Sequence, residues 1–104
     1  MSPVVRSAHS QLALAARADR ARVYRDPRWR GPGGTRARTL DRAYGQCEYP
    51  IDDWNRKCCE PATIADHWPT PLAQVLAQGG DPYDDANTRA LCAHHSGKAD
   101  GGRS

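Results

Sequence analysis

Apolar residues recur at three- and four-residue steps between Val5 and Val23, with Arg at many of the positions between them. This period is typical of an amphipathic helix, and we expect one over residues 5–23. Because its apolar side is mostly Ala, we expect it to pack weakly and to fray. Residues 31–34 are all Gly or Pro and interrupt the pattern. Residues 1–34 are therefore predicted to form a basic helical arm that ends in a linker.

The pattern becomes shorter and more varied after the linker. Thr35 is a suitable N-cap and Gly45 a suitable C-cap, so a second helix is predicted over residues 35–44. Further along, β-branched residues and turn signals alternate. The elements predicted there are a strand over residues 46–49, a strand over residues 63–67, a short helix from Pro71 to Leu76 with Thr70 as its cap, and a last helix that Asn87 opens and that ends near Lys98.

The composition limits the size of the core. The chain has 104 residues, no Phe, 38% hydrophobic residues, 9 Gly and 8 Pro, which suits one domain with a thin core that needs a covalent or metal staple. No apolar run is long enough to cross a membrane, and none resembles a secretory signal, so we expect a cytoplasmic protein. In that compartment four Cys with four His favour zinc over disulfides. A disulfide-stabilised secreted domain remains the alternative.

Charge divides the chain in two. Residues 1–45 carry ten Arg against three Asp, and residues 46–104 carry five Lys or Arg against nine Asp or Glu, within a net charge of +3. A basic segment beside an acidic one that can bind metal suits a partner with a phosphate backbone. The alternative is a solvated Arg-rich helix.

Five short motifs follow one another in a fixed order. They are Cys47; Cys58 ahead of Pro61-Ala62-Thr63; Asp66-His67 with Pro69; Asn87 to Leu91-Cys92; and His94-His95 with Lys98. In this order and spacing, residues 24–98 resemble the HNH endonuclease family, in particular its small zinc-bearing forms from phages and actinobacteria. The chain departs from the family pattern in three places: ten residues separate Cys47 from Cys58, Cys58 and Cys59 form an ambiguous pair, and a single residue separates Cys92 from the His pair.

The resemblance implies a fold and a division of the chain. The fold is α+β, a small ββα-metal (HNH, His-Me finger) fold with a zinc knuckle and N-terminal helices. The nuclease domain would occupy residues 35–98, after the arm of residues 1–34 and before a disordered tail over residues 99–104.

The resemblance also implies a reaction, the hydrolysis of phosphodiester bonds in DNA by nicking or cutting the duplex. His67 is then the general base, Asp66 and His95 hold a catalytic divalent ion (Mg2+, Mn2+, Ni2+ or Zn2+), and Asn87 fixes the loop through its amide. The plainer alternatives are a His67 bonded to a backbone carbonyl, an Asp66 that caps a turn and an Asn87 that caps a helix.

A structural Zn2+ site would clamp the elements that carry these residues. Its ligands in the family pattern are Cys47, Cys58, Cys92 and His94. Two assignments stay open: His95 in place of His94 on zinc, with His94 at the active site, and Cys59 as a substitute for Cys58.

Double-stranded DNA is the partner that the resemblance implies, with phage terminase or packaging proteins as possible associates and no membrane. The residues expected to contact DNA phosphates are Arg28, Arg30, Arg36, Arg38, Arg42 and Lys98. Trp29 is expected to pack under the arm. A competing function is a non-catalytic zinc module that binds DNA or a protein. Zinc binding does not need His67, whereas hydrolysis does, so replacing His67 distinguishes the two functions.

Overall fold

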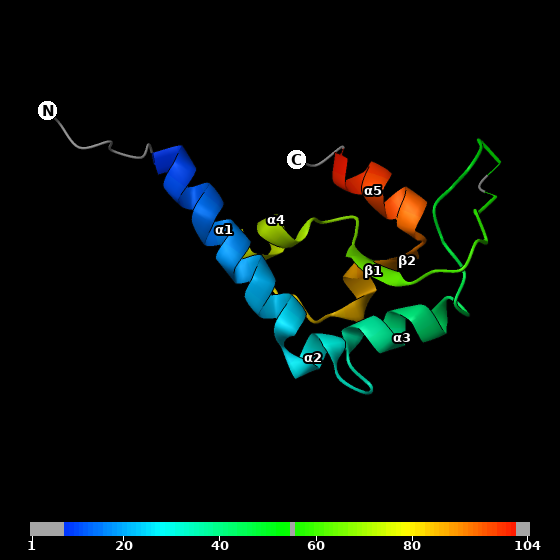
Figure 1. Ribbon diagram of the computed structural model, residues 1–104, viewed down its shortest axis with the longest axis horizontal. Helices are drawn as coiled ribbons and strands as arrows, with labels where there is room; N and C mark the ends of the chain where they lie inside the picture. Colours follow the sequence, from blue (N-terminus) through cyan, green and yellow to red (C-terminus); the bar gives the residue numbers. More distant parts are fainter. Residues whose placement is uncertain (1–7, 55, 102–104) are drawn as a thin grey trace, which may run out of the picture.

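A pair of short antiparallel strands lies between helices in this computed structural model, which describes residues 8–54 and 56–101 and the side chains of residues 17–54 and 56–97 (Figure 1). The protein is a small α+β structure. The elements in chain order are helix α1 (Ala8–Arg25), helix α2 (Pro27–Arg30), helix α3 (Thr35–Arg42), strand β1 (Ile64–His67), helix α4 (Leu72–Ala77), the 3-10 turn η1 (Asp85–Asn87), strand β2 (Thr88–Leu91) and helix α5 (Ala93–Gly101).

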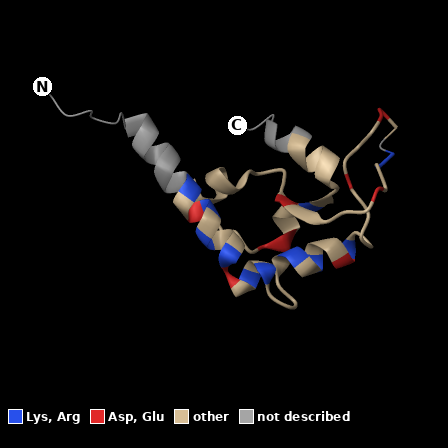
Figure 2. Ribbon diagram, in the orientation of Figure 1, with Lys and Arg blue, Asp and Glu red and all other residues tan. Residues whose placement is uncertain are grey.

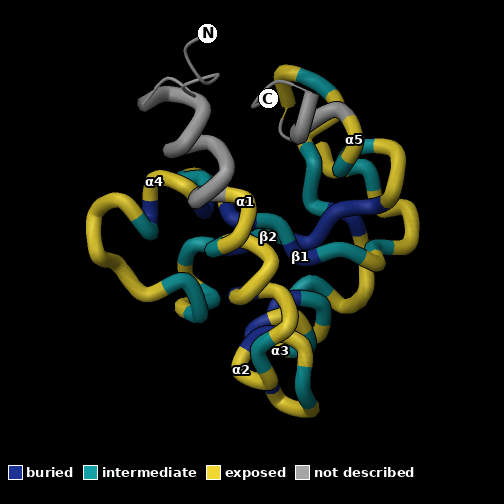
Figure 3. The backbone as a smooth tube through the Cα atoms, turned by 60° about the vertical axis from the view of Figure 1, so that its left-hand side comes forward, coloured by how far each residue is buried: buried dark blue, intermediate teal, exposed yellow. Residues whose placement is uncertain are grey.

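The strands are antiparallel, with Ile64 opposite Leu91 and His67 opposite Thr88. Helices α3 and α5 each contact both strands, and they lie on opposite sides of the pair (Figure 1). Because successive strand residues point to opposite faces, Ala65 and His67 face one layer while Asp66 faces the other. Buried positions concentrate on β1 and β2 (Figure 3).

Two clusters of buried side chains form the core, one on each face of the sheet. The first joins Val23, Trp29, Ala65 and Leu72, and the second joins Cys47, Leu91 and Cys92. The first cluster takes residues from both sides of the expected boundary between residues 34 and 35. The basic helices are therefore packed onto the strand that carries Asp66-His67.

The start of α2 shows why the chain turns after α1. Asp26 is the N-cap, and its carboxylate accepts a hydrogen bond from the Arg28 N–H at 2.8 Å. Pro27 occupies the first helical turn, where its missing N–H costs nothing. Asp26 and Pro27 therefore start a short helix between α1 and the Gly/Pro segment of residues 31–34.

Helix α3 confirms the second predicted helix, although its ends differ. Its N-cap is Gly34, and Thr35 is instead a fully buried first residue whose hydroxyl donates to Tyr83 O at 2.6 Å. Its C-cap is Ala43, and Gly45 follows with a φ of 68° that favours glycine.

Three other sequence predictions are wrong in the second half. Residues 46–49 form no strand, only isolated bridges at Gln46 and Pro50. Asn87 opens no helix, because β2 follows it and the last helix begins at Ala93. The cap of α4 is Pro71 rather than Thr70.

Two expectations concern the chain ends and the membrane. Residues 5–7 of the first predicted helix and residues 102–104 of the predicted tail lie outside the described residues, whereas α5 continues to Gly101. Within the described part, no helix combines the length and apolar character that crossing a membrane requires.

Candidate metal centre

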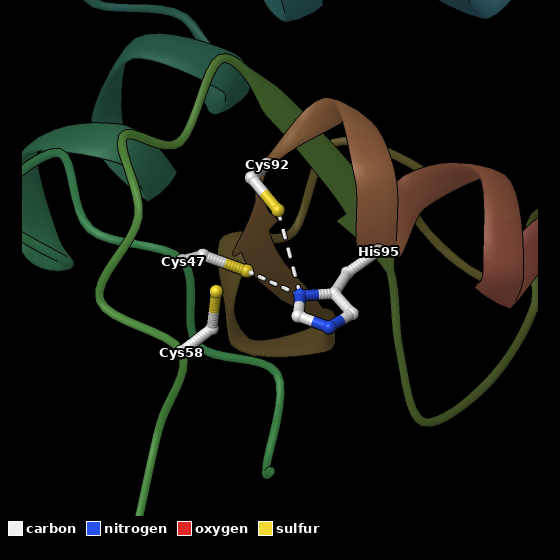
Figure 4. Close-up of side chains that lie close together, drawn as sticks. All are labelled: Cys47, Cys58, Cys92 and His95. Carbon is white, nitrogen blue, oxygen red and sulfur yellow. Dashed lines mark hydrogen bonds between the residues drawn. The ribbon is translucent and has the colours of Figure 1, made fainter.

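Four side chains from three segments of the chain converge beside β2: Cys47, Cys58, Cys92 and His95 (Figure 4). Each offers one ligand atom, and these atoms lie within 4.8 Å of one another. The Nδ1 atom of His95 lies 3.5 Å from the Cys47 sulfur and 3.4 Å from the Cys92 sulfur. Zinc binds sulfur at about 2.3 Å and imidazole nitrogen at about 2.0 Å, which in a tetrahedron separates each sulfur from the nitrogen by about 3.5 Å. The residues present therefore fit a tetrahedral zinc ion.

Backbone hydrogen bonds bring the two upstream thiols together across ten intervening residues. The Cys47 N–H donates to Glu60 O at 2.7 Å, and the Cys58 N–H donates to Tyr49 O at 3.0 Å. Cys59 has a φ of 61° and an exposed side chain outside the cluster. The cluster thus contains Cys58, the cysteine that we preferred, and not Cys59, and the insertion leaves the pairing of the two segments intact.

The other two candidate ligands, Cys92 and His95, lie where α5 begins. Cys92 immediately precedes α5, and its carbonyl accepts a hydrogen bond from the Ser96 N–H at 2.9 Å. Residues three apart lie on one side of a helical turn, so the side chain of His95 meets that of Cys92. His94 is exposed one position earlier. Our preference for His94 as a zinc ligand is therefore wrong, and His95 takes that place.

Tyr49 orients the imidazole, a contact that sequence reasoning missed. The rings of Tyr49 and His95 are stacked, with centroids 4.4 Å apart and planes 5° from parallel. A tyrosine two residues after Cys47 is the only sequence signal for it, and no spacing rule links it to His95. The stack fixes the ring plane and thereby the direction of Nδ1 toward the sulfurs.

The pKa values of two of the thiols depart in opposite directions. The pKa of Cys92 is lowered, chiefly because the backbone N–H of His95, at the helix start, donates a hydrogen bond to its sulfur. The pKa of Cys58 is raised: the hydrogen bond from the Glu60 backbone lowers it, but burial and the neighbouring Cys47 and Cys92 thiols together raise it more. Crowded thiols resist ionising together, and a bound cation removes that conflict.

His67 lies in the other layer and faces away from this cluster. It is 2% exposed, and its ring stacks on Trp29 with centroids 4.7 Å apart. Its Nε2 lies 2.8 Å from Pro82 O, and since a carbonyl only accepts, Nε2 carries the proton. This arrangement is the plainer alternative that the sequence analysis gave for His67, a histidine bonded to a backbone carbonyl.

The predicted catalytic ion site is not assembled. Asp66 points to the opposite face of β1 from His67, and His95 is held among the thiols. The Asp66 carboxylate pairs with Arg89 Nε at 3.5 Å and lines a cavity of about 250 Å³ with Arg36 and Ser96. The prediction that Asp66, His67 and His95 gather around one ion is therefore wrong.

Asn87 binds the loop that follows β1. Its amide accepts from the Thr70 N–H at 3.0 Å and donates to Thr70 O at 2.8 Å. It caps no helix, because it ends η1 just before β2. The amide closes the long connection between the two strands.

Most of the arginines expected on DNA phosphates are engaged within the protein. Backbone carbonyls of residues 33, 63, 83, 85 and 88 accept hydrogen bonds from Arg36, Arg38 and Arg42. Arg28 pairs with Asp26 and lies over the ring of Tyr83. Arg30 is exposed. The side chain of Lys98 lies outside the described residues.

No known protein family, curated protein or solved structure matches this chain. The function therefore has to be inferred from the geometry of the described residues.

Proposed function

We propose that this chain is a zinc-stabilised module of the HNH type that binds DNA. The observation that carries the proposal is the convergence of three thiols and one imidazole from separate segments. An ion at that point would join the loop after α3 to the end of β2 and the start of α5. A chain with so thin a core gains much of its folding free energy from such a link.

The donor set favours zinc over a disulfide or simple burial. Thiolate and imidazole are the ligands of structural zinc sites, whereas a disulfide would use two sulfurs and leave the third beside an imidazole. The four cysteines are unbridged. The order of segments is a pair of thiols, then the Asp66-His67 strand, then a second strand followed at once by the third thiol and a helix. This is the order that the HNH resemblance implies.

The basic helices support DNA as the partner. Residues 17–42 carry nine Arg and three Asp, and Figure 2 shows the cations along α1, α2 and α3. Although these side chains are engaged within the protein, part of their surface stays in solvent: those of Arg28, Arg38 and Arg42 are 68%, 46% and 43% exposed. Fixed guanidinium groups suit phosphate oxygens, and such binding is sequence-independent.

Binding of a short fluorescent duplex at several salt concentrations tests this proposal. We expect affinity to fall steeply with salt, and Arg30→Ala to weaken binding and reduce the salt slope by about one counterion. Arg56→Ala is the matched control, because Arg56 is an exposed arginine in the acidic half that pairs with Asp52. A zinc-loaded protein that retains no duplex at low salt would overturn the proposal.

Phosphodiester hydrolysis is a second candidate function, and one cavity favours it. Asp66, a hard oxygen ligand, lines the cavity of about 250 Å³ together with Arg36. The rings of Tyr24 and Trp29 line it too, and both lie against His67, with centroids 6.0 and 4.7 Å away. A base at His67 would need those rings to move before water reached it.

Plasmid nicking with added magnesium, manganese, nickel or zinc tests this second function. Asp66→Asn should abolish nicking and leave zinc content and duplex retention unchanged. Wild-type protein that binds the plasmid and nicks it with none of these ions would exclude hydrolysis and leave the binding function standing.

A further inference from the structure

A second cavity lies beside the end of the sheet and is separate from the cavity at Asp66. It measures about 500 Å³, and it is lined by Glu48, Pro50, Lys57, Trp68, Thr88 and Arg89. Its walls come from the residue after β1, from β2 and from the loop between the two upstream thiols. A volume of this size is in the range that holds a small organic ligand.

Trp68 gives the cavity an aromatic wall. The residue is 46% exposed, although it follows directly after β1 and its backbone N–H donates to Asn87 O at 3.1 Å. The Arg89 guanidinium lies 4.9 Å from the ring centroid and is itself tied to Asp66. A ring held in this way loses little conformational entropy when a ligand stacks on it.

The same arginine connects this wall to the metal centre. Arg89 also lies over the ring of Tyr49 at 5.2 Å, and Tyr49 is stacked on His95. A chain of ring contacts thus runs from the cluster to the cavity, in the order His95, Tyr49, Arg89 and Trp68. Trp68 is therefore positioned by groups on the face of the sheet that carries the cluster, the face that the ion would hold together.

Charges at the cavity differ in how far they are neutralised. Lys57 is 55% exposed, and its amine lies 4.0 Å from Glu48 Oε2, a weak pairing in solvent. Arg89 is 12% exposed and paired with Asp66. The cavity therefore offers an ammonium group at its edge, a carboxylate acceptor and an aromatic surface.

These three features are complementary to one nucleotide. A base stacks on an aromatic ring, its N–H groups suit a carboxylate, and its phosphate suits an ammonium. A base inside a duplex is stacked on both faces and cannot enter a pocket. We propose that this cavity holds an unpaired nucleobase of a single-stranded nucleic acid, with Trp68 as the stacking surface and Lys57 on the phosphate; the proposal rests on the nucleic-acid binding proposed above.

Single-strand and duplex binding by the zinc-loaded protein separate the two proposals. The probes are a fluorescent single-stranded DNA of mixed sequence and the duplex of the same sequence. We expect Trp68→Ala to weaken single-strand binding by roughly tenfold, the size of one lost base–aromatic stack, and to change duplex binding less than about twofold. Trp54→Ala is the matched control, because Trp54 is 84% exposed in the neighbouring loop and does not line the cavity.

Each outcome supports or overturns the nucleobase site. Tenfold loss on the single strand alone, with Trp54→Ala unchanged and zinc content intact, supports it. An unchanged Trp68→Ala, an equal loss on both probes, or an equal loss in Trp54→Ala overturns it and leaves the DNA-binding function standing. Wild-type protein that retains neither probe overturns both proposals.

Discussion

Two histidines are each stacked on an aromatic ring, and their surroundings give them opposite chemistry. The ring of His95 lies 4.4 Å from that of Tyr49, and the ring of His67 lies 4.7 Å from that of Trp29. At His95 a ring nitrogen faces two sulfurs, whereas at His67 a ring nitrogen meets the carbonyl of Pro82. Stacking sets the plane of an imidazole, and the atoms at its nitrogens determine whether it can bind a metal or belongs to the core.

The two faces of the sheet differ in the same way. On the His95 face the buried cluster contains thiols, and we attribute its cohesion to an ion. On the His67 face buried threonines hydrogen-bond among apolar side chains, without a ligand set for metal among the described residues. Loss of one side chain should therefore affect zinc content on one face and packing on the other.

The largest effect is expected from Cys92→Ser. Loss of one thiolate should release the zinc and cost on the order of the whole stability of a small domain, about 5 kcal/mol. Zinc analysis and thermal unfolding would measure it. Cys59→Ser is the control and should keep both the ion and the melting temperature, since Cys59 is exposed and outside the cluster. Equal zinc content in the two variants would contradict the ligand set.

His67→Ala should come next and should leave the zinc in place. Removing a buried ring that stacks on Trp29 leaves a cavity and an unpaired Pro82 carbonyl, at a cost of roughly 3 kcal/mol. Urea unfolding gives the free energy, and zinc analysis gives the contrast with His95→Ala, which should lose the ion. If the His67→Ala protein folded but had lost its zinc, the proposed difference between the two faces would be wrong.

A smaller effect is expected at the threonines of the His67 face. The Thr39 hydroxyl donates to Thr35 O at 2.8 Å and lies 2.7 Å from the Thr88 hydroxyl, which also bonds Asp85 O. Thr39→Val should cost about 1–2 kcal/mol, because Thr88 keeps one partner. Urea unfolding should show no such loss for the exposed Thr63→Val, and equal losses would argue against the buried network.

The smallest effect is expected at the cap of α2. Arg28 holds the pKa of Asp26 down to about 2, mainly through a side-chain hydrogen bond. A depressed folded pKa stabilises the protein above the ordinary carboxyl pKa, and this contribution disappears only as the pH falls through the depressed value. Asp26→Asn should therefore lower the melting temperature slightly, by the same amount at every pH from about 5.5 to 8. A difference that varied within that range would contradict this origin.

Much of the site was predictable because its chemistry depends on residue type. Three thiols and a histidine near the helix start point to a metal whichever backbone carries them, and the β-branched Thr63 and Ile64 indicate the strand that ends at His67. The choice between His94 and His95 depended on where α5 begins, and the sequence does not show that α5 begins at Ala93. A shift of one residue in the start of the helix would turn one of these histidines toward the sulfurs and the other toward solvent.

Other errors share a tertiary cause. Residues 88–91 formed a strand because β1 and Glu48 lie beside them: Ala90 O accepts the Glu48 N–H at 2.8 Å, and the Glu48 side chain accepts from the Ala90 N–H. A short apolar segment after an Asn suits a helix start equally well in sequence alone. The arginines likewise bind carbonyls that only the folded chain brings near them.

X-ray absorption at the zinc edge, on protein purified with zinc, tests the central claim most directly. The account predicts one zinc per chain, with three sulfurs at about 2.3 Å and one nitrogen at about 2.0 Å. The nitrogen should disappear in His95→Ala and persist in His94→Ala. A protein without stoichiometric zinc, or a zinc bound mainly by oxygen, would contradict it.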